Sequence, residues 1–193
     1  GWVRDPGDLL HADTTLFVTL EKYVKDVLTD FRDDERIVLW DLYNEPGNSG
    51  YGNKSMPLLK KVFHWAREIN PSQPLSVGVW NAKLKELGAY QLENSDVITY
   101  HNYSDPQTHQ DWIDSLRTHN RPLICTEYMA RTRNSLFKVI LPMLQKEDIG
   151  AINWGLVSGK SNTIYAWDSP MPDGREPAVW FHDIFRKDGT PHD

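Results

Sequence analysis

The feature of this sequence that most constrains its fold is a regular alternation of short apolar runs with longer amphipathic segments. The apolar runs are rich in β-branched and aromatic residues and are bounded by polar or turn-forming residues, so each predicts a buried strand. Strands that are apolar throughout and separated by helices are typical of a parallel sheet covered on both faces. The sequence therefore predicts an α/β protein. The five expected strands cover 37–43, 75–80, 96–103, 122–128 and 150–156.

Amphipathic helices are expected between these strands, because apolar residues recur there at intervals of three and four. Asp13 and Ser55 are suited to cap the first two helices, and Pro106 is suited to open a later one. Pro142 should kink or split the helix that contains it. The expected helices cover 13–31, 55–69, 83–89, 134–146 and 177–185, with one more beginning at Asp105-Pro106.

The composition describes an ordinary folded protein and argues against several classes of function. A chain of 193 residues favours one domain, spanning 1–193. The formal net charge of −6, with no basic stripe, argues against a nucleic-acid or anionic-membrane partner. Cys125 is the only cysteine, which excludes an internal disulfide, and its apolar neighbours indicate a buried strand thiol. No apolar run is long enough to predict a membrane-spanning helix.

Two of the expected strands end in a glutamate. Glu45 follows the first strand within Asn44-Glu45-Pro46, and Glu127 ends the fourth. In a closed barrel, strands three apart face each other across the mouth, and the carboxyl ends of the strands build the active site. A doubly wound sheet would usually leave these residues distant, and no glycine-rich nucleotide loop follows any strand to favour that alternative.

Such a pair of carboxylates suits the hydrolysis of glycosides with retention of configuration, which requires a separation of about 5–5.5 Å. One carboxylate attacks the anomeric carbon, and the other gives a proton to the leaving oxygen. The charge of one glutamate also raises the pKa of its neighbour, so the pair can supply both an acid and a nucleophile.

Four segments, LYNEPGN, ITYHNY, LICTEY and AINWGL, resemble in this order the fourth, sixth, seventh and eighth strands of clan A retaining glycoside hydrolases. Glycoside hydrolase family five, the cellulase and mannanase group, is the nearest. The resemblance implies a (β/α)8 TIM barrel of which this chain holds about the last five βα units. Three upstream units are then absent, and another chain or a missing N-terminal segment would complete the barrel.

The resemblance also implies roles for individual residues. Glu45 is the expected acid/base and Glu127 the expected nucleophile. Asn44 is expected to hydrogen-bond the sugar 2-OH, while His101 and Tyr103 line the site and Tyr103 reaches the nucleophile. Trp154 is the expected platform under the sugar, because apolar sugar faces stack on indole. Trp80, at the end of the second strand, is a further candidate for substrate binding.

The function expected from these residues is retaining hydrolysis of β-linked poly- or oligosaccharides, with carbohydrate as the partner and no cofactor. A metal site is not expected, because His101, His109 and the nearby Asp105 or Asp111 match no compact ligand motif. The alternative is a non-catalytic carbohydrate-binding or inactive barrel fragment. No signal peptide is recognisable in this chain, although a secreted or periplasmic location would suit the activity.

Two features of the second half of the chain leave further alternatives open. Arg131 and Arg133 could clamp a charged sugar, but a solvated or capping role is the simpler interpretation. The polar loop 160–176 is expected to border the cleft, so that its deletion would change substrate preference more than stability.

Overall fold

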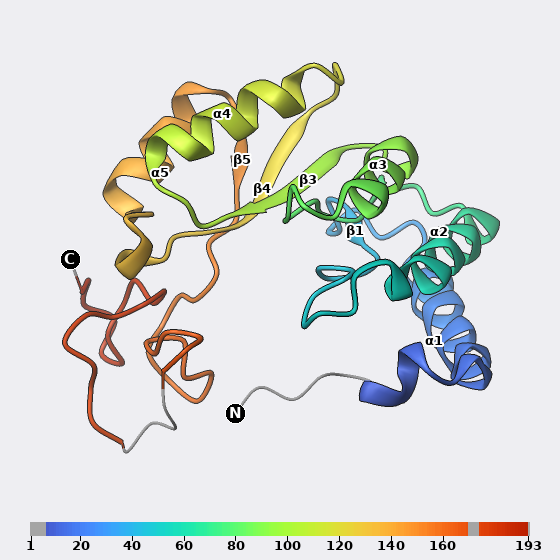
Figure 1. Ribbon diagram of the computed structural model, residues 1–193, viewed down its shortest axis with the longest axis horizontal. Coiled ribbons are helices and arrows are strands. Elements are labelled where there is room, and N and C mark those ends of the chain that lie inside the picture. Colours follow the sequence, from blue (N-terminus) through green and yellow to red (C-terminus); the bar gives the residue numbers. More distant parts are fainter. Residues whose placement is uncertain (1–6, 170–173, 193) are drawn as a thin grey trace. The chain divides into compact units, whose positions relative to one another are not determined.

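The computed structural model describes residues 7–169 and 174–192, and the chain divides into two compact units, Gly1–Ile98 and Thr99–Asp193 (Figure 1). In the first unit, β1 and β2 are parallel, with Trp40 opposite Leu75. The elements of this unit are the 3-10 helices η1 (Asp8–His11), η2 (Thr14–Leu16) and η3 (Gly52–Ser55), the helices α1 (Phe17–Asp30), α2 (Met56–Ile69) and α3 (Lys85–Asn94), and the strands β1 (Trp40–Asp41) and β2 (Leu75–Ser76).

Helix α2 is the centre of the first unit, because two of its sides carry buried apolar residues. On one side, Leu58, Val62 and Trp65 pack against Leu10 and residues of α1. On another side, Leu59 and Phe63 pack against Val77, which follows β2, and against Leu87 of α3. This arrangement accounts for the alternation of the predicted helix 55–69, since the intervening positions of α2 are polar and exposed.

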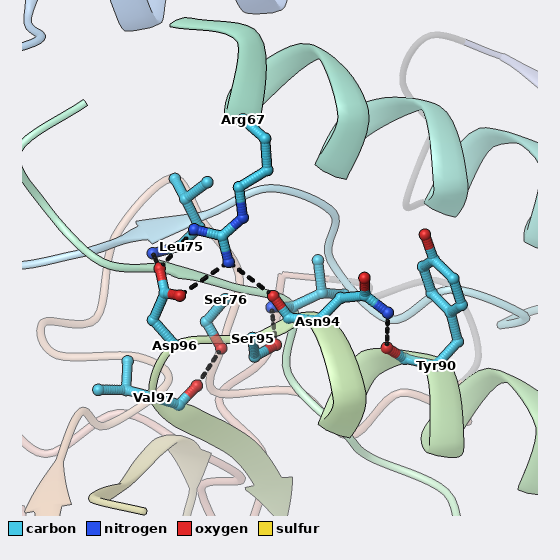
Figure 2. A network of polar contacts seen from close by, with 9 residues as sticks. Arg67, Leu75, Ser76, Tyr90, Asn94, Ser95, Asp96 and Val97 are labelled. Atoms are coloured by element: carbon cyan, nitrogen blue, oxygen red, sulfur yellow. Dashed lines mark hydrogen bonds and ion pairs between the residues drawn. The ribbon is translucent and has the colours of Figure 1, made fainter. Parts of the chain in front are cut away.

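A network of polar contacts joins α2, β2 and the segment after α3 (Figure 2). The guanidinium of Arg67 donates to both carboxylate oxygens of Asp96, at 2.9 and 2.8 Å, and to the carbonyl of Asn94 at 2.8 Å. Asp96 also accepts a hydrogen bond from the backbone N–H of Leu75 at 2.8 Å, and its own N–H donates to the Leu75 carbonyl. The start of β2, whose residues are fully buried, is thereby anchored through one carboxylate.

The second unit is built on the three strands of one sheet, in the order β3-β4-β5. Strands β4 and β5 are parallel, with Ile124 opposite Gly150, and all five residues of β3 are buried. Figure 1 shows α4 and α5 lying along this sheet. The elements are the strands β3 (Ile98–Asn102), β4 (Leu123–Tyr128) and β5 (Gly150–Ala151), the helices α4 (Pro106–Arg117) and α5 (Phe137–Lys146), and the 3-10 helix η4 (Arg131–Arg133).

The expected order of strands and helices is present, but several boundaries differ. Strands β1, β2 and β5 are two residues long, and Val38, within the predicted strand 37–43, is 77% exposed. Asp13 caps the 3-10 turn that precedes α1, by accepting from the Thr15 N–H. The prediction that Ser55 caps α2 is wrong, because its hydroxyl accepts a hydrogen bond from Gly47 instead. Helix α5 continues through Pro142 and is not split.

The prediction of a helix at 177–185 is wrong, because the described part of the chain has no helix in this segment. Its backbone bonds reach distant residues: Phe181 and His182 donate to the carbonyls of Ile164 and Thr163, and Ile184 donates to that of Leu156. The partners that an isolated helix would find four residues away are thus replaced by partners in the loop after β5. Across residues 7–169 and 174–192, none of the helices has the length and apolar character needed to cross a membrane.

The Arg67–Asp96 ion pair and the hydrogen bond from the Leu75 N–H to Asp96 should both contribute to stability, and two variants separate their contributions. Asp96→Ala should lower the free energy of unfolding by about 1–2 kcal/mol, because it removes the ion pair and leaves the buried Leu75 N–H without its acceptor. Arg67→Met removes the partly exposed ion pair and the hydrogen bond to the Asn94 carbonyl but keeps the bond from Leu75 to Asp96, so it should cost about half as much. Urea unfolding followed by circular dichroism gives both values. A loss for Asp96→Ala no larger than that for Arg67→Met would contradict the anchoring role of the bond from Leu75.

Candidate active site

Glu127 lies near the carboxyl end of β4 and is held by two side chains from the end of β3. The Tyr103 hydroxyl donates to its Oε2 atom at 2.7 Å, and His101 Nδ1 lies 3.2 Å from the same oxygen. The Glu127 side chain is 12% exposed and that of His101 is 4% exposed, so the carboxylate has lost most of its water. A carboxylate in such a place needs donors from the protein, which Tyr103 and His101 supply.

The backbone immediately after Glu127 adopts an uncommon conformation. Met129 is buried with a φ of 75°, in the left-handed region that costs a residue other than glycine about 1 kcal/mol or more. The His182 Nδ1–H donates a hydrogen bond to the Met129 carbonyl oxygen, with the two atoms 2.7 Å apart. The His182 ring also lies 5.4 Å from the ring of Tyr103. His182 therefore supports both the turn after Glu127 and the tyrosine that bonds to it.

A cluster of aromatic side chains surrounds Tyr103 on its other sides. Its ring meets that of Trp167 edge to face, with centroids 4.8 Å apart, and Trp167 meets Phe181 in the same way at 4.8 Å. The guanidinium of Arg133 lies 5.0 Å from the centroid of the Trp167 ring. Sequence reasoning singled out none of Trp167, Phe181 and His182, and the only signal was that Trp167 lies in the loop expected to border the cleft.

The first part of that loop is an integral part of the fold. Thr163 is buried, and its hydroxyl lies 2.8 and 2.9 Å from the two carboxylate oxygens of the buried Asp183. Burial raises the pKa of Asp183, and the hydrogen bond from Thr163 and the charge of Arg131 oppose that shift. Removing residues 160–176 would take away Thr163 and leave the buried Asp183 carboxylate without this donor, so a loss of stability is expected from the deletion. The change in substrate preference expected from deleting this loop stays a prediction.

In the first unit, Glu45 follows β1 within a tight turn. Its φ of 47° is left-handed, and the Asn48 side-chain amide donates to its Oε2 atom at 2.5 Å. The Asn48 N–H donates to the Glu45 carbonyl at 3.1 Å, which closes the turn. Asn48 was not singled out from the sequence, although asparagine is a common turn residue and this one lies three residues after the candidate acid. Asn44 is exposed at the start of this turn.

Two hydrogen bonds hold the turn that carries Glu45 in place. The Trp80 indole N–H donates to the Pro46 carbonyl at 3.0 Å, and the Gly47 N–H donates to the buried Ser55 hydroxyl at 2.9 Å. Gly47 has a φ of 84°, and a Cβ atom there would lie 2.7 Å from a methyl group of Leu87. Trp80 thus fixes the position of the Glu45 turn, a structural role beside the substrate-binding role predicted for it.

The remaining candidates are Trp154, His109, Asp105 and Cys125. Trp154 follows β5 and is 36% exposed. His109 is fully buried on α4, where its Nε2 atom lies 3.0 Å from the Tyr100 hydroxyl, and Asp105 caps the same helix. Neither joins His101 in a set of ligands. Cys125 is a free, buried thiol as predicted, and burial raises its pKa to about 12.

Comparison with known proteins identifies the same family that the motifs resemble. Residues 7–160 match the protein-family profile described as cellulase, glycosyl hydrolase family 5. No curated protein is similar enough to the sequence to count as a match.

Several solved structures share the fold. A β-glucuronidase from Faecalibacterium prausnitzii has 13% identity and a TM-score of 0.61 over 89% of this chain, which spans 32% of that protein. An endo-1,4-β-xylanase from Caldicellulosiruptor owensensis has 17% identity and a TM-score of 0.56 over 91% of this chain, which spans 66% of that protein. A family 10 endo-β-1,4-xylanase from Gloeophyllum trabeum has 15% identity and a TM-score of 0.55, with 92% and 64% covered. The predicted α/β fold of the TIM-barrel type, as a partial barrel, is confirmed.

The Glu45 turn predicts different effects for two glycines with similar φ angles. Gly47→Ala should lower the free energy of unfolding by about 2 kcal/mol, because the added methyl meets the fully buried Leu87 in a backbone already strained for alanine. Gly50→Ala, with a φ of 80° and open space around it, should cost only the backbone strain of about 1 kcal/mol. Urea unfolding of both variants tests this. A smaller loss for Gly47→Ala than for Gly50→Ala would contradict the packing described here.

The two buried histidines predict a pH dependence of stability. Burial lowers the pKa of both His109 and His182 to about 4, from an ordinary value of 6.5. Between these values the unfolded chain takes up protons that the folded chain does not, so stability is fully present above about pH 6.5 and falls as the pH approaches 4. The free energy of unfolding, measured at intervals from pH 7 to 4, should show this decline.

Removal of one buried histidine should flatten that dependence. His109→Gln keeps a polar side chain that does not titrate, so its stability should fall less between pH 7 and 4 than that of the parent chain. His119→Gln, at an exposed position, is the matched control and should leave the slope unchanged. Identical slopes for all three proteins would show that His109 does not contribute.

Proposed function

Because the chain belongs to the cellulase family, glycosyl hydrolase family 5, we propose that it is the catalytic part of a retaining glycoside hydrolase acting on β-linked poly- or oligosaccharides. Both units then belong to one catalytic domain whose partner is a carbohydrate. The observation that carries this proposal is the pair of donors, Tyr103 and His101, directed at the carboxylate of Glu127. The names of the fold relatives, β-glucuronidase and endo-1,4-β-xylanase, agree with a β-linked substrate.

Glu127 is the proposed nucleophile. Its carboxylate attacks the anomeric carbon while the bond from that carbon to the leaving oxygen breaks, and a glycosyl ester forms on the enzyme. The two donors on Oε2 hold the carboxylate in one orientation, which favours an in-line approach to the carbon. They also replace water around a charge that is mostly buried, so the nucleophile needs little rearrangement when the substrate arrives.

Glu45 is the proposed acid/base. In the first step it gives its proton to the leaving oxygen, and in the second it takes a proton from the water that hydrolyses the glycosyl ester. The amide of Asn48 donates to its carboxylate and holds it in one orientation. Glu45 follows β1 and Glu127 lies near the carboxyl end of β4, and the carboxyl ends of such strands form the catalytic rim of a barrel.

The other predicted residues receive supporting roles in this mechanism. Asn44 would hydrogen-bond the sugar 2-OH, an interaction that strengthens in the transition state. Trp154 offers a half-exposed indole for stacking on the apolar face of a sugar. Trp80 acts through Pro46 by fixing the turn of Glu45 and would contact substrate only with its remaining surface.

A mechanism-based label tests the nucleophile. Incubation of the folded chain with a panel of activated 2-deoxy-2-fluoro glycosides should give a covalent sugar on Glu127, detected by intact mass and peptide mapping. Glu127→Gln should abolish the adduct, because an amide does not form the glycosyl ester. Glu93→Gln, on the exposed surface of α3, is the matched control and should be labelled as the parent chain is.

The acid/base requires a separate variant. Glu45→Ala should slow turnover of a substrate with a poor leaving group by about 10²–10⁴-fold, and added azide should restore much of the rate with an activated substrate. An adduct on another residue, or full turnover by Glu127→Gln, would contradict the mechanism. Sugar binding without any adduct or turnover would favour the alternative of a carbohydrate-binding fragment.

A further inference from the structure

An exposed indole lies one side chain away from Glu127. Trp167 is 42% exposed, although its ring contacts the ring of Tyr103, whose hydroxyl donates to Glu127. The buried Phe181 meets Trp167 edge to face from another side, with an interplanar angle of 87°. A large apolar side chain that is held by its neighbours and still faces solvent is a ready surface for a sugar ring.

A cation accompanies this indole. The guanidinium of Arg133 lies over the Trp167 ring, 5.0 Å from its centroid. Arg133 belongs to η4, which begins three residues after the strand that carries Glu127, so the same strand end positions both residues. The turn is pinned by hydrogen bonds between the backbones of Ala130 and Ser135, at 2.9 and 3.3 Å, and by one from Arg131 to the Phe181 carbonyl.

The charge of Arg133 has no carboxylate partner at ion-pair distance within residues 7–169 and 174–192. The other arginine of the turn, Arg131, is used differently. Its guanidinium donates to the Trp180 carbonyl, and its charge acts on the buried Asp183. One arginine therefore holds the C-terminal segment in place, while the other presents a positive charge beside an exposed indole.

We propose that Arg133 and Trp167 form a subsite for a sugar residue that carries a carboxylate, so that the glycan acted on is acidic or bears acidic branches. A guanidinium matches the planar geometry of a carboxylate and can bind it through two parallel hydrogen bonds. The indole stacks on the apolar face of the same sugar or of its neighbour. The inference deepens the proposed function, since it names the substrate class of the site that contains Glu127.

Matched oligosaccharides test the subsite. Two β-1,4-linked oligosaccharides of equal length, identical except that one carries a glucuronic acid residue, are titrated into the folded chain by calorimetry. We expect the acidic member to bind about fivefold more tightly at low salt, with the preference falling as salt is added. Equal affinities, or no binding of either member, would overturn the inference.

Variants assign the preference to the two residues. Arg133→Gln should abolish it without weakening the neutral oligosaccharide, and Arg133→Lys should keep part of it, because a lysine retains the charge but not the planar fork. Trp167→Ala should weaken both ligands. Lys138→Gln removes one positive charge from the exposed surface of α5 and is the matched control, expected to keep the full preference.

The outcomes for the subsite and for the proposed function are separable. Persistence of the preference in Arg133→Gln overturns the subsite, whatever the catalytic result. Labelling of Glu127 by a fluoroglycoside does not depend on Arg133, so labelling together with equal affinities would leave the hydrolase proposal standing and the subsite refuted. Circular dichroism of each variant confirms that it is folded before its affinity is compared.

Discussion

A buried strand must find partners for its backbone hydrogen bonds inside the protein, and β3 shows how much depends on this constraint. All five of its residues are buried, and it is hydrogen-bonded to β4. This pairing brings the end of β3 beside the end of β4, where His101 and Tyr103 reach the carboxylate of Glu127. The geometry of the candidate nucleophile is therefore a consequence of strand pairing, and α4 and α5 stabilise it by covering the sheet.

Both candidate carboxylates are associated with left-handed backbone at a residue other than glycine. Glu45 has this conformation itself, and Met129 has it two residues after Glu127. Such backbone persists only where surrounding contacts over-determine it, and it is concentrated at functional sites. In the first unit the Trp80 indole and the Asn48 amide supply those contacts, and in the second His182 does so through the Met129 carbonyl.

The C-terminal segment gives the second unit a support that no regular element provides. Residues 181–184 exchange backbone hydrogen bonds with the loop after β5, and they place Phe181 and His182 against the aromatic cluster around Tyr103. The buried Asp183 is stabilised by Thr163, which ties the two segments at a point without secondary structure. Orientation of Tyr103, and through it of Glu127, thus depends on residues about 80 positions further along the chain.

The sequence by itself determined the order of strands and helices, the strand-end positions of both glutamates, the buried state of Cys125 and the family, because each of these depends on local periodicity or on short motifs. The cap predicted at Ser55 and the helix predicted at 177–185 were wrong for one reason: in each case a distant partner, Gly47 or the loop 156–164, took the hydrogen bonds that local propensity assigned. The aromatic cluster of Trp167, Phe181 and His182 was decided only by the tertiary structure. Its members carry no motif, and contacts between side chains far apart in the chain are set by how the whole unit packs.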